Sequence, residues 1–402
     1  MIFSREALKG ITFLSLGKIL RVLVALIVGL YIMRELGPEN YTKFQYLVYW
    51  SSILIVIIEF ASFDVVQKKF QEEIPVAKVN ADTFFTKLFL LLLVSIVYFV
   101  FFLFSYNTHI SISEATYYYP TLVFSAFNYG RYFFFYDHQT KFIGIGESAA
   151  IFISSLLKVY VIYMKLEFTI FLFASTLEGL FLAIYFNIKS PINLKAVHPA
   201  KIKARLNEGF KPLSNDLLFI LERYLPLLLL VTFSKTQDIT GLIIAFTLVD
   251  TLSTFAIPLI QYIYPLMLKN EETSHRYFFL FFGVGLFLSL CINTFGANII
   301  LTVLGSKYEK SIEIFKILSW VLYYNFLKVY LIRLFFIKNH LSSYISMTAV
   351  NLFFMCCFAF FSEKNLQLYI YGTIFFPMLL LTLYIFLNKD FYNAIKFRRS
   401  ES

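Results

Sequence analysis

Long apolar stretches separated by short polar turns follow one another through the whole chain. They predict twelve helices, at residues 11–32, 42–61, 84–105, 120–136, 143–164, 168–187, 213–233, 240–263, 277–296, 312–334, 342–361 and 367–387. At about 1.5 Å per residue, each except the short fourth one can cross a hydrocarbon core of about 30 Å. The pattern therefore predicts an all-α, polytopic membrane protein in which helices joined by short turns pack antiparallel.

The longest polar interruption divides these helices six and six. It predicts an N-terminal lobe at 1–188, a basic cytoplasmic linker at 189–211 and a C-terminal lobe at 212–402. The turn Asn40-Tyr41-Thr42 after the first helix is weakly similar to the turn Ile239-Thr240-Gly241 after the seventh helix. This similarity favours two sequence repeats of six helices each. Such repeats would be related by an axis along the membrane normal and would enclose a central cavity, with substrate held near the midplane.

The composition agrees with this class of protein. Of the 402 residues, 59% are hydrophobic and 15% are charged, whereas about a quarter are charged in soluble domains. The net charge of +10 favours an anionic partner, but cytoplasmic loops of membrane proteins also collect Lys and Arg. With the N-terminus inside, twenty of the 35 Lys and Arg residues, Lys87 among them, face inside and eight face outside. Both termini are therefore expected in the cytoplasm.

Several basic residues fall inside the predicted helices, where a charge costs about 2.5 to 3.5 kcal/mol and usually faces a cavity or a partner. Arg21 lies ten residues into the first helix, about 15 Å deep, and shares a face with Lys18. Arg131 and Arg223 lie as deep in the fourth and seventh helices. The competing interpretation of the first pair is a helix-packing seam that carries two cations.

Other charged residues lie nearer to the predicted helix ends, where a long side chain can reach the headgroups instead. For Lys158 and Lys328 this competes with a role in binding substrate. Glu59, Glu147 and Arg333 are expected to reach the membrane interface.

Three acids are candidates for coupling ions or counter-charges. Glu178 is near the middle of the sixth helix, Asp250 lies on a polar stripe of the eighth, and Glu222 precedes Arg223. Each could carry a proton, hold Na⁺, or neutralise a deep arginine. The counter-charge interpretation is favoured.

Three short motifs resemble those of a known family. The stretch Arg34-Glu35-Leu36-Gly37-Pro38-Glu39-Asn40-Tyr41 resembles the first helical hairpin of Wzx-type O-antigen flippases of the MOP (MATE-like) exporter superfamily, although Thr42 stands where that family usually has Gly. Leu304-Gly305-Ser306-Lys307-Tyr308, followed by residues 314–320, resembles the turn before helix 10, and residues 207–212 resemble the entry to helix 7. The family's acid after the helix 7 arginine is absent here.

The resemblance implies a flippase that moves undecaprenyl-diphosphate-linked oligosaccharide from the cytoplasmic to the periplasmic leaflet of the bacterial inner membrane by alternating access. The expected substrate-binding residues are Arg21, Arg131, Arg223, Lys18, Lys158 and Lys328, and the expected coupling or counter-charge residues are Asp250, Glu178 and Glu222. No enzyme activity, cofactor, metal or nucleic acid is expected, and H⁺ or Na⁺ coupling is left open. The other expected partners are membrane lipids and other polysaccharide-assembly membrane proteins.

Alternatives from two classes remain. A multidrug exporter of the same superfamily would need an acid-lined cavity for cationic drugs, whereas the deep charges here are mostly basic. A membrane polysaccharide polymerase or glycosyltransferase would need a sizeable extramembrane loop with paired carboxylates, and the loops here are short, with lone histidines at His109 and His275.

Overall fold

The computed structural model of the chain describes the backbone of most of its 402 residues. The described residues are 5–60, 66, 69–70, 72, 74–104, 110–137, 139–193, 199–233, 239–257, 259–260, 263, 267, 274–337, 341–362 and 366–387. The side chains of residues 5–22 and of some other residues within helices fall outside the description. All the regular elements within the described part are helices, which confirms the predicted all-α class.

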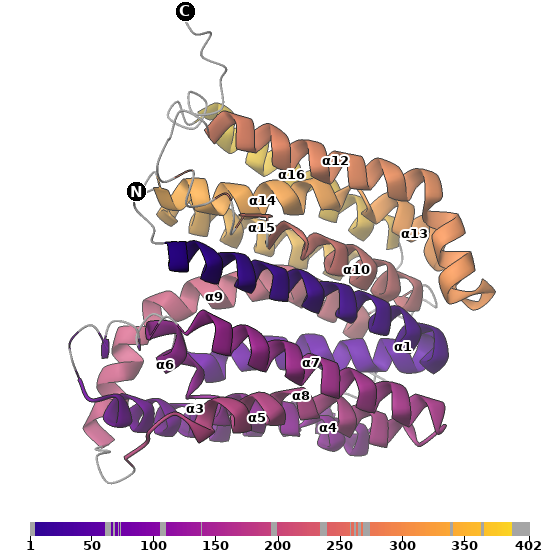
Figure 1. Cartoon of the computed structure of the whole chain (residues 1–402). Helices are drawn as coiled ribbons and strands as arrows, with labels where there is room; N and C mark the ends of the chain where they lie inside the picture. The colour runs from indigo at the N-terminus through magenta and orange to yellow at the C-terminus, as the bar shows by residue number, and fades with distance from the viewer. Residues whose placement is uncertain are drawn as a thin grey trace, which may run out of the picture. The chain divides into compact units, whose positions relative to one another are not determined.

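The first two predicted helices form one element, α1 (Arg5–Glu59), which turns back on itself at Gly37 (Figure 1). Gly37 has φ 76° and ψ 167°, a conformation that glycine adopts without steric cost. Pro38 follows at the start of the second arm, where its missing N–H is not needed, and its carbonyl accepts the Thr42 hydroxyl at 2.8 Å. The predicted hairpin turn is therefore formed by Gly37 and Pro38.

The next helices follow the predicted order, but the fourth is divided. They are α3 (Val76–Phe104), α4 (Ile112–Tyr118), α5 (Pro120–Phe127), α6 (Arg131–Tyr136), α7 (Thr140–Tyr163) and α8 (Phe168–Ile188). The predicted fourth helix, which looked too short to span, corresponds to α5 and α6. Helix α5 packs against both α3 and α8, and α1 packs against α7 (Figure 1).

Helix α9 (Pro199–Phe233) begins within the predicted linker and continues through the predicted seventh helix. The remaining helical elements are α10 (Ile239–Ser253), α12 (Ser274–Ile299), η3 (Ile300–Leu304), η4 (Ser306–Tyr308), α13 (Ser311–Leu318), α14 (Val321–Ile337), α15 (Leu341–Phe361) and α16 (Leu366–Leu387). By packing, the chain forms unit 1 (Met1–Tyr224) and unit 2 (Leu225–Ser402). This division falls within α9, and the grouping of the helices into six and six stays a prediction.

Eight helices of the described part are long and apolar enough to cross a membrane. Helix α3 shows why: its outer face carries exposed apolar side chains, such as Leu92, Ile96 and Leu103, each at least 60% exposed. Most of its polar residues, Asn80 and Lys87 among them, are buried within the protein. Apolar residues facing outward and polar residues facing protein are the distribution expected in lipid. The chain is a multi-pass membrane protein.

Each unit contains a divided helix held by the helix before it. In unit 1, the Tyr98 hydroxyl on α3 donates to the Ala115 carbonyl of α4 at 2.9 Å. In unit 2, Ser289 of α12 donates to the Ser319 carbonyl at 2.7 Å, at the junction of α13 and α14. These side chains are second donors, since the two carbonyls also accept the backbone N–H groups of Tyr119 and Leu322. They tie each divided helix to the helix before it.

Candidate functional site

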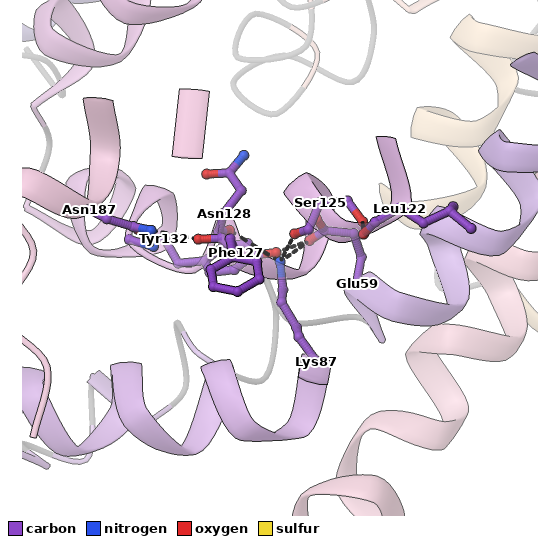
Figure 2. A network of polar contacts seen from close by, with 9 residues as sticks. Glu59, Lys87, Leu122, Ser125, Phe127, Asn128, Tyr132 and Asn187 are labelled. Carbon is purple, nitrogen blue, oxygen red and sulfur yellow. Dashed lines mark hydrogen bonds and ion pairs between the residues drawn. The ribbon is translucent and has the colours of Figure 1, made fainter. Parts of the chain in front are cut away.

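The break between α5 and α6 concentrates buried charge in unit 1. Helix α5 ends at Phe127, Asn128 leaves the helical conformation at φ −84° and ψ 63°, and α6 begins at Arg131. The last carbonyls of a helix have no donor within it. Here the Lys87 ammonium of α3 donates to the carbonyls of Ser125 at 3.4 Å and Asn128 at 3.2 Å (Figure 2).

Helix α8 closes the other side of the break through Asn187. The Asn187 side-chain amide donates to the Phe127 carbonyl at 2.6 Å, and its oxygen accepts the Gly130 N–H at 3.1 Å. A Cβ atom added to Gly130 would lie only 2.7 Å from the Phe186 carbonyl oxygen and 2.8 Å from the Ser190 Cβ. Close approach of the two backbones therefore requires glycine at this position.

Replacing Gly130 with Ala should destabilise the protein. Since the added methyl meets a backbone carbonyl that cannot move aside, we expect a loss of about 1 to 3 kcal/mol, seen as a lower midpoint of thermal unfolding in detergent. The matched control is Gly283→Ala in α12, where an added Cβ meets nothing within 4 Å. The control should be neutral or stabilising by up to about 1 kcal/mol. Equal midpoints for the two variants would contradict the prediction.

Lys87 is completely buried, at 0% exposure, and lies within a set of polar contacts. Its ammonium pairs with the Glu59 carboxylate of α1 at 2.9 Å and lies 5.0 Å from the centre of the Tyr132 ring. The Tyr132 hydroxyl donates to the same carboxylate (Figure 2). A buried ammonium is tolerated when such partners replace its water shell.

The sequence interpretation of Lys87 was wrong. Lys87 was assigned to a cytoplasmic segment, but α3 begins at Val76 and contains Lys87 in its fourth turn. That Glu59 reaches the membrane interface stays a prediction. A signal was present: Asn80, Thr83 and Lys87 are spaced three and four apart, which places them on one helix face. All three are buried.

Arg131, a predicted substrate-binding residue, begins α6 and pairs with Glu147 of α7. The Arg131 side chain is 38% exposed, whereas that of Glu147 is 9% exposed. Glu147 was expected at the interface and is instead buried, with the Arg131 guanidinium as its partner. The break therefore presents one partly open guanidinium, which is paired with a buried carboxylate, near the Lys87–Glu59 pair.

The other predicted residues of unit 1 are spread over several helices. Glu178 in α8 and Lys158 in α7 are half-buried, and Glu222 in α9 is buried. Arg223 lies 5.3 Å from the centre of the Tyr224 ring. Tyr224 in turn stacks on Tyr49 of α1 at 4.7 Å. The side chains of Lys18 and Arg21 lie outside the described residues.

In unit 2, Asp250 of α10 and Lys328 of α14 are half-buried, and Arg333 is exposed. The Asn325 side-chain amide of α14 donates to the Ser253 hydroxyl of α10 at 2.9 Å and joins these two helices. No group of three His, Cys, Asp or Glu side chains in the described part could hold a metal ion. A cavity shared by Arg21, Arg131 and Arg223 stays a prediction.

Neither a family model nor a curated protein sequence matches the chain. Solved structures do, over nearly their whole lengths and at 12% identity. One is an inward-facing multidrug resistance MATE transporter of the MOP superfamily. The match includes 95% of this chain and 96% of that transporter, with a TM-score of 0.70. The eukaryotic MATE transporter AtDTX14 is covered over 98% by 96% of this chain, with a TM-score of 0.66.

A third similar structure is a MOP superfamily transporter from Pyrococcus furiosus, described as having a binding pocket of reverse polarity that suggests a different function. It is matched over 97% of both chains with a TM-score of 0.58. The helices thus define a class of protein: a multi-pass membrane protein with a transporter fold. In particular, the chain has the fold of the MATE transporters of the MOP superfamily.

Proposed function

We propose that this protein is a flippase that moves undecaprenyl-diphosphate-linked oligosaccharide across the bacterial inner membrane by alternating access. The observation that carries the proposal is Arg131, a partly exposed arginine at the break of a membrane helix. A guanidinium has five N–H donors in a forked arrangement that suits phosphate oxygens, so it can hold a carboxylate and a phosphate at the same time. A diphosphate drawn through the membrane interior needs such a partner.

The other predicted residues would contribute to binding this substrate or to coupling its transport. Arg21, Arg223 and Lys18 would add positive charge, and Lys158 and Lys328 would do so nearer to the membrane surfaces. Glu178, Glu222 and Asp250 would neutralise these cations between substrates or carry the coupling ion, H⁺ or Na⁺. Both termini would lie in the cytoplasm.

The second candidate is a multidrug exporter, because similar structures are described as multidrug resistance transporters. A cationic drug would need acids in the binding site. In unit 1, the buried Glu147 and the partly buried Glu59 are already paired with Arg131 and Lys87, which leaves these acids neutralised. The Pyrococcus furiosus transporter, described as having a pocket of reverse polarity that suggests a different function, is a precedent for a change of pocket polarity on this fold. These observations favour an anionic substrate.

Transport by the purified protein in proteoliposomes tests the proposal. We expect a fluorescent polyprenyl-diphosphate-linked oligosaccharide to become protected from an impermeant quencher only when the protein is present. The same lipid with a neutral linkage should not move, because it has no phosphate for Arg131. Movement of a cationic dye without movement of the diphosphate lipid would favour the multidrug candidate. Repeating the assay with pH and Na⁺ gradients tests whether transport is coupled to either ion.

A further inference from the structure

Lys87 cannot bind a substrate directly, because its side chain is completely buried. Its contacts nevertheless lie on both sides of Arg131, the residue proposed to bind the substrate. On one side of the break it donates to the carbonyls of Ser125 and Asn128, and on the other side it lies over the Tyr132 ring. Arg131 falls between these two points.

Glu59 contacts the second side of the break, at the start of α6. Its carboxylate accepts the Tyr132 hydroxyl and pairs with Lys87, so the start of α6 is attached to α1 and α3 together (Figure 2). Because Tyr132 follows Arg131 directly in the first turn of α6, the direction of the Arg131 side chain depends on where this turn begins. If the chain continued as a helix from α5 through residues 128–130, each added residue would rotate Arg131 by about 100° around the helix axis.

We infer that Lys87 is a positioning residue for the proposed diphosphate site: by donating to the carbonyls at the end of α5, it fixes where α6 begins and so aims Arg131. This inference rests on the proposed function for the identity of the ligand. The contacts by which Lys87 and Glu59 fix the break between α5 and α6 lie within unit 1 and do not depend on that function. It differs from a plain ion pair in one respect. The carbonyl oxygens require a donor at position 87, whereas an ion pair requires only opposite charges.

The decisive variants separate these two roles. Glu59→Gln with Lys87→Met removes both charges and leaves no buried charge unpaired, so the protein should fold, but position 87 then donates nothing. Lys87→Arg keeps the donor. Exchange of the pair, Glu59→Lys with Lys87→Glu, keeps opposite charges but turns a carboxylate toward two carbonyl oxygens. Lys141→Met, an exposed lysine in the first turn of α7, is the control for loss of one positive charge.

The probe is farnesyl diphosphate, and its binding to the protein in nanodiscs is measured by calorimetry, with farnesol as the ligand without phosphate. We expect about tenfold weaker binding for Glu59→Gln/Lys87→Met, the loss of one charge-assisted hydrogen bond, and no recovery in the exchanged pair. Lys87→Arg and Lys141→Met should stay near the wild-type value. When Arg131→Ala is present, Glu59→Gln/Lys87→Met should have no further effect, because the two act through one contact.

Hydrogen exchange of residues 125–132 gives a reading that does not depend on the ligand. These amides should exchange faster in Glu59→Gln/Lys87→Met and at the wild-type rate in Lys87→Arg. If the wild-type protein binds no farnesyl diphosphate, the proposed function fails. The hydrogen-exchange measurement still tests whether Lys87 fixes the break between α5 and α6. Unchanged exchange in Glu59→Gln/Lys87→Met, or full recovery of binding in the exchanged pair, would overturn the inference.

Discussion

Replacing Arg131 with Ala should abolish most flipping of the diphosphate-linked lipid. Hydrogen bonds to a charged group contribute about 1.5 to 3 kcal/mol, so the concentration of lipid that half-saturates transport should rise about tenfold to a hundredfold. Arg131→Lys should retain part of the activity, because it keeps the charge and loses the forked geometry. The measurement is the initial rate of quencher protection in proteoliposomes at increasing lipid concentration.

Two controls separate binding from folding in this experiment. Arg131→Ala leaves the Glu147 carboxylate buried beside an empty position, so Arg131→Ala with Glu147→Gln should fold normally and still fail to transport. Arg333→Ala removes an exposed arginine from α14 and should transport at the wild-type rate. Normal transport by the Arg131→Ala/Glu147→Gln protein would mean that Arg131 does not bind the diphosphate.

Replacing Glu59 with Ala should have the largest effect on stability. It leaves the Lys87 ammonium, at 0% exposure, without its carboxylate, and breaking a buried pair from one side is strongly destabilising. We expect a loss of about 3 kcal/mol, the lower end of the range for buried pairs, because a third of the Glu59 side chain is exposed. Thermal unfolding in detergent at neutral pH measures the loss.

The reason for this loss is the orphaned charge, and the paired variant tests it. Glu59→Gln with Lys87→Met contains no unpaired ammonium and should recover most of the stability lost in Glu59→Ala. If the two proteins unfold at the same temperature, the stability comes from packing at this position and the ion pair does not contribute.

Much of the fold could be predicted from the sequence because lipid imposes a simple rule on each helix separately. A spanning helix satisfies its own backbone and needs only length and apolar side chains, and both are readable residue by residue. For this reason α7, α8 and α15 lie close to their predicted ranges. The hairpin at Gly37 was readable for a similar reason, since Gly followed by Pro restricts the backbone locally.

The candidate site was predicted only in part. Arg131 was singled out by its depth in an apolar segment, but its partner Glu147 was assigned to the interface. Lys87 and Glu59 were missed, because each lies close enough to a predicted helix end for its side chain to reach the headgroups. Depth along a single helix cannot distinguish a side chain that reaches water from one that another helix covers.

The sequence by itself therefore determined that this is an all-α, multi-pass membrane protein, where its main helices lie, and that basic residues occur within them. Only the tertiary structure decided that the fourth helix breaks at residues 128–130, and which residues satisfy the break. The physical reason is that the helical hydrogen-bond ladder stops there: short backbone contacts reach the carbonyls of Ser125 and Phe127, and side chains from other helices supply the further donors. These donors, Lys87 of α3 and Asn187 of α8, are brought to the break from 41 and 60 residues away by the packing of these helices around α5.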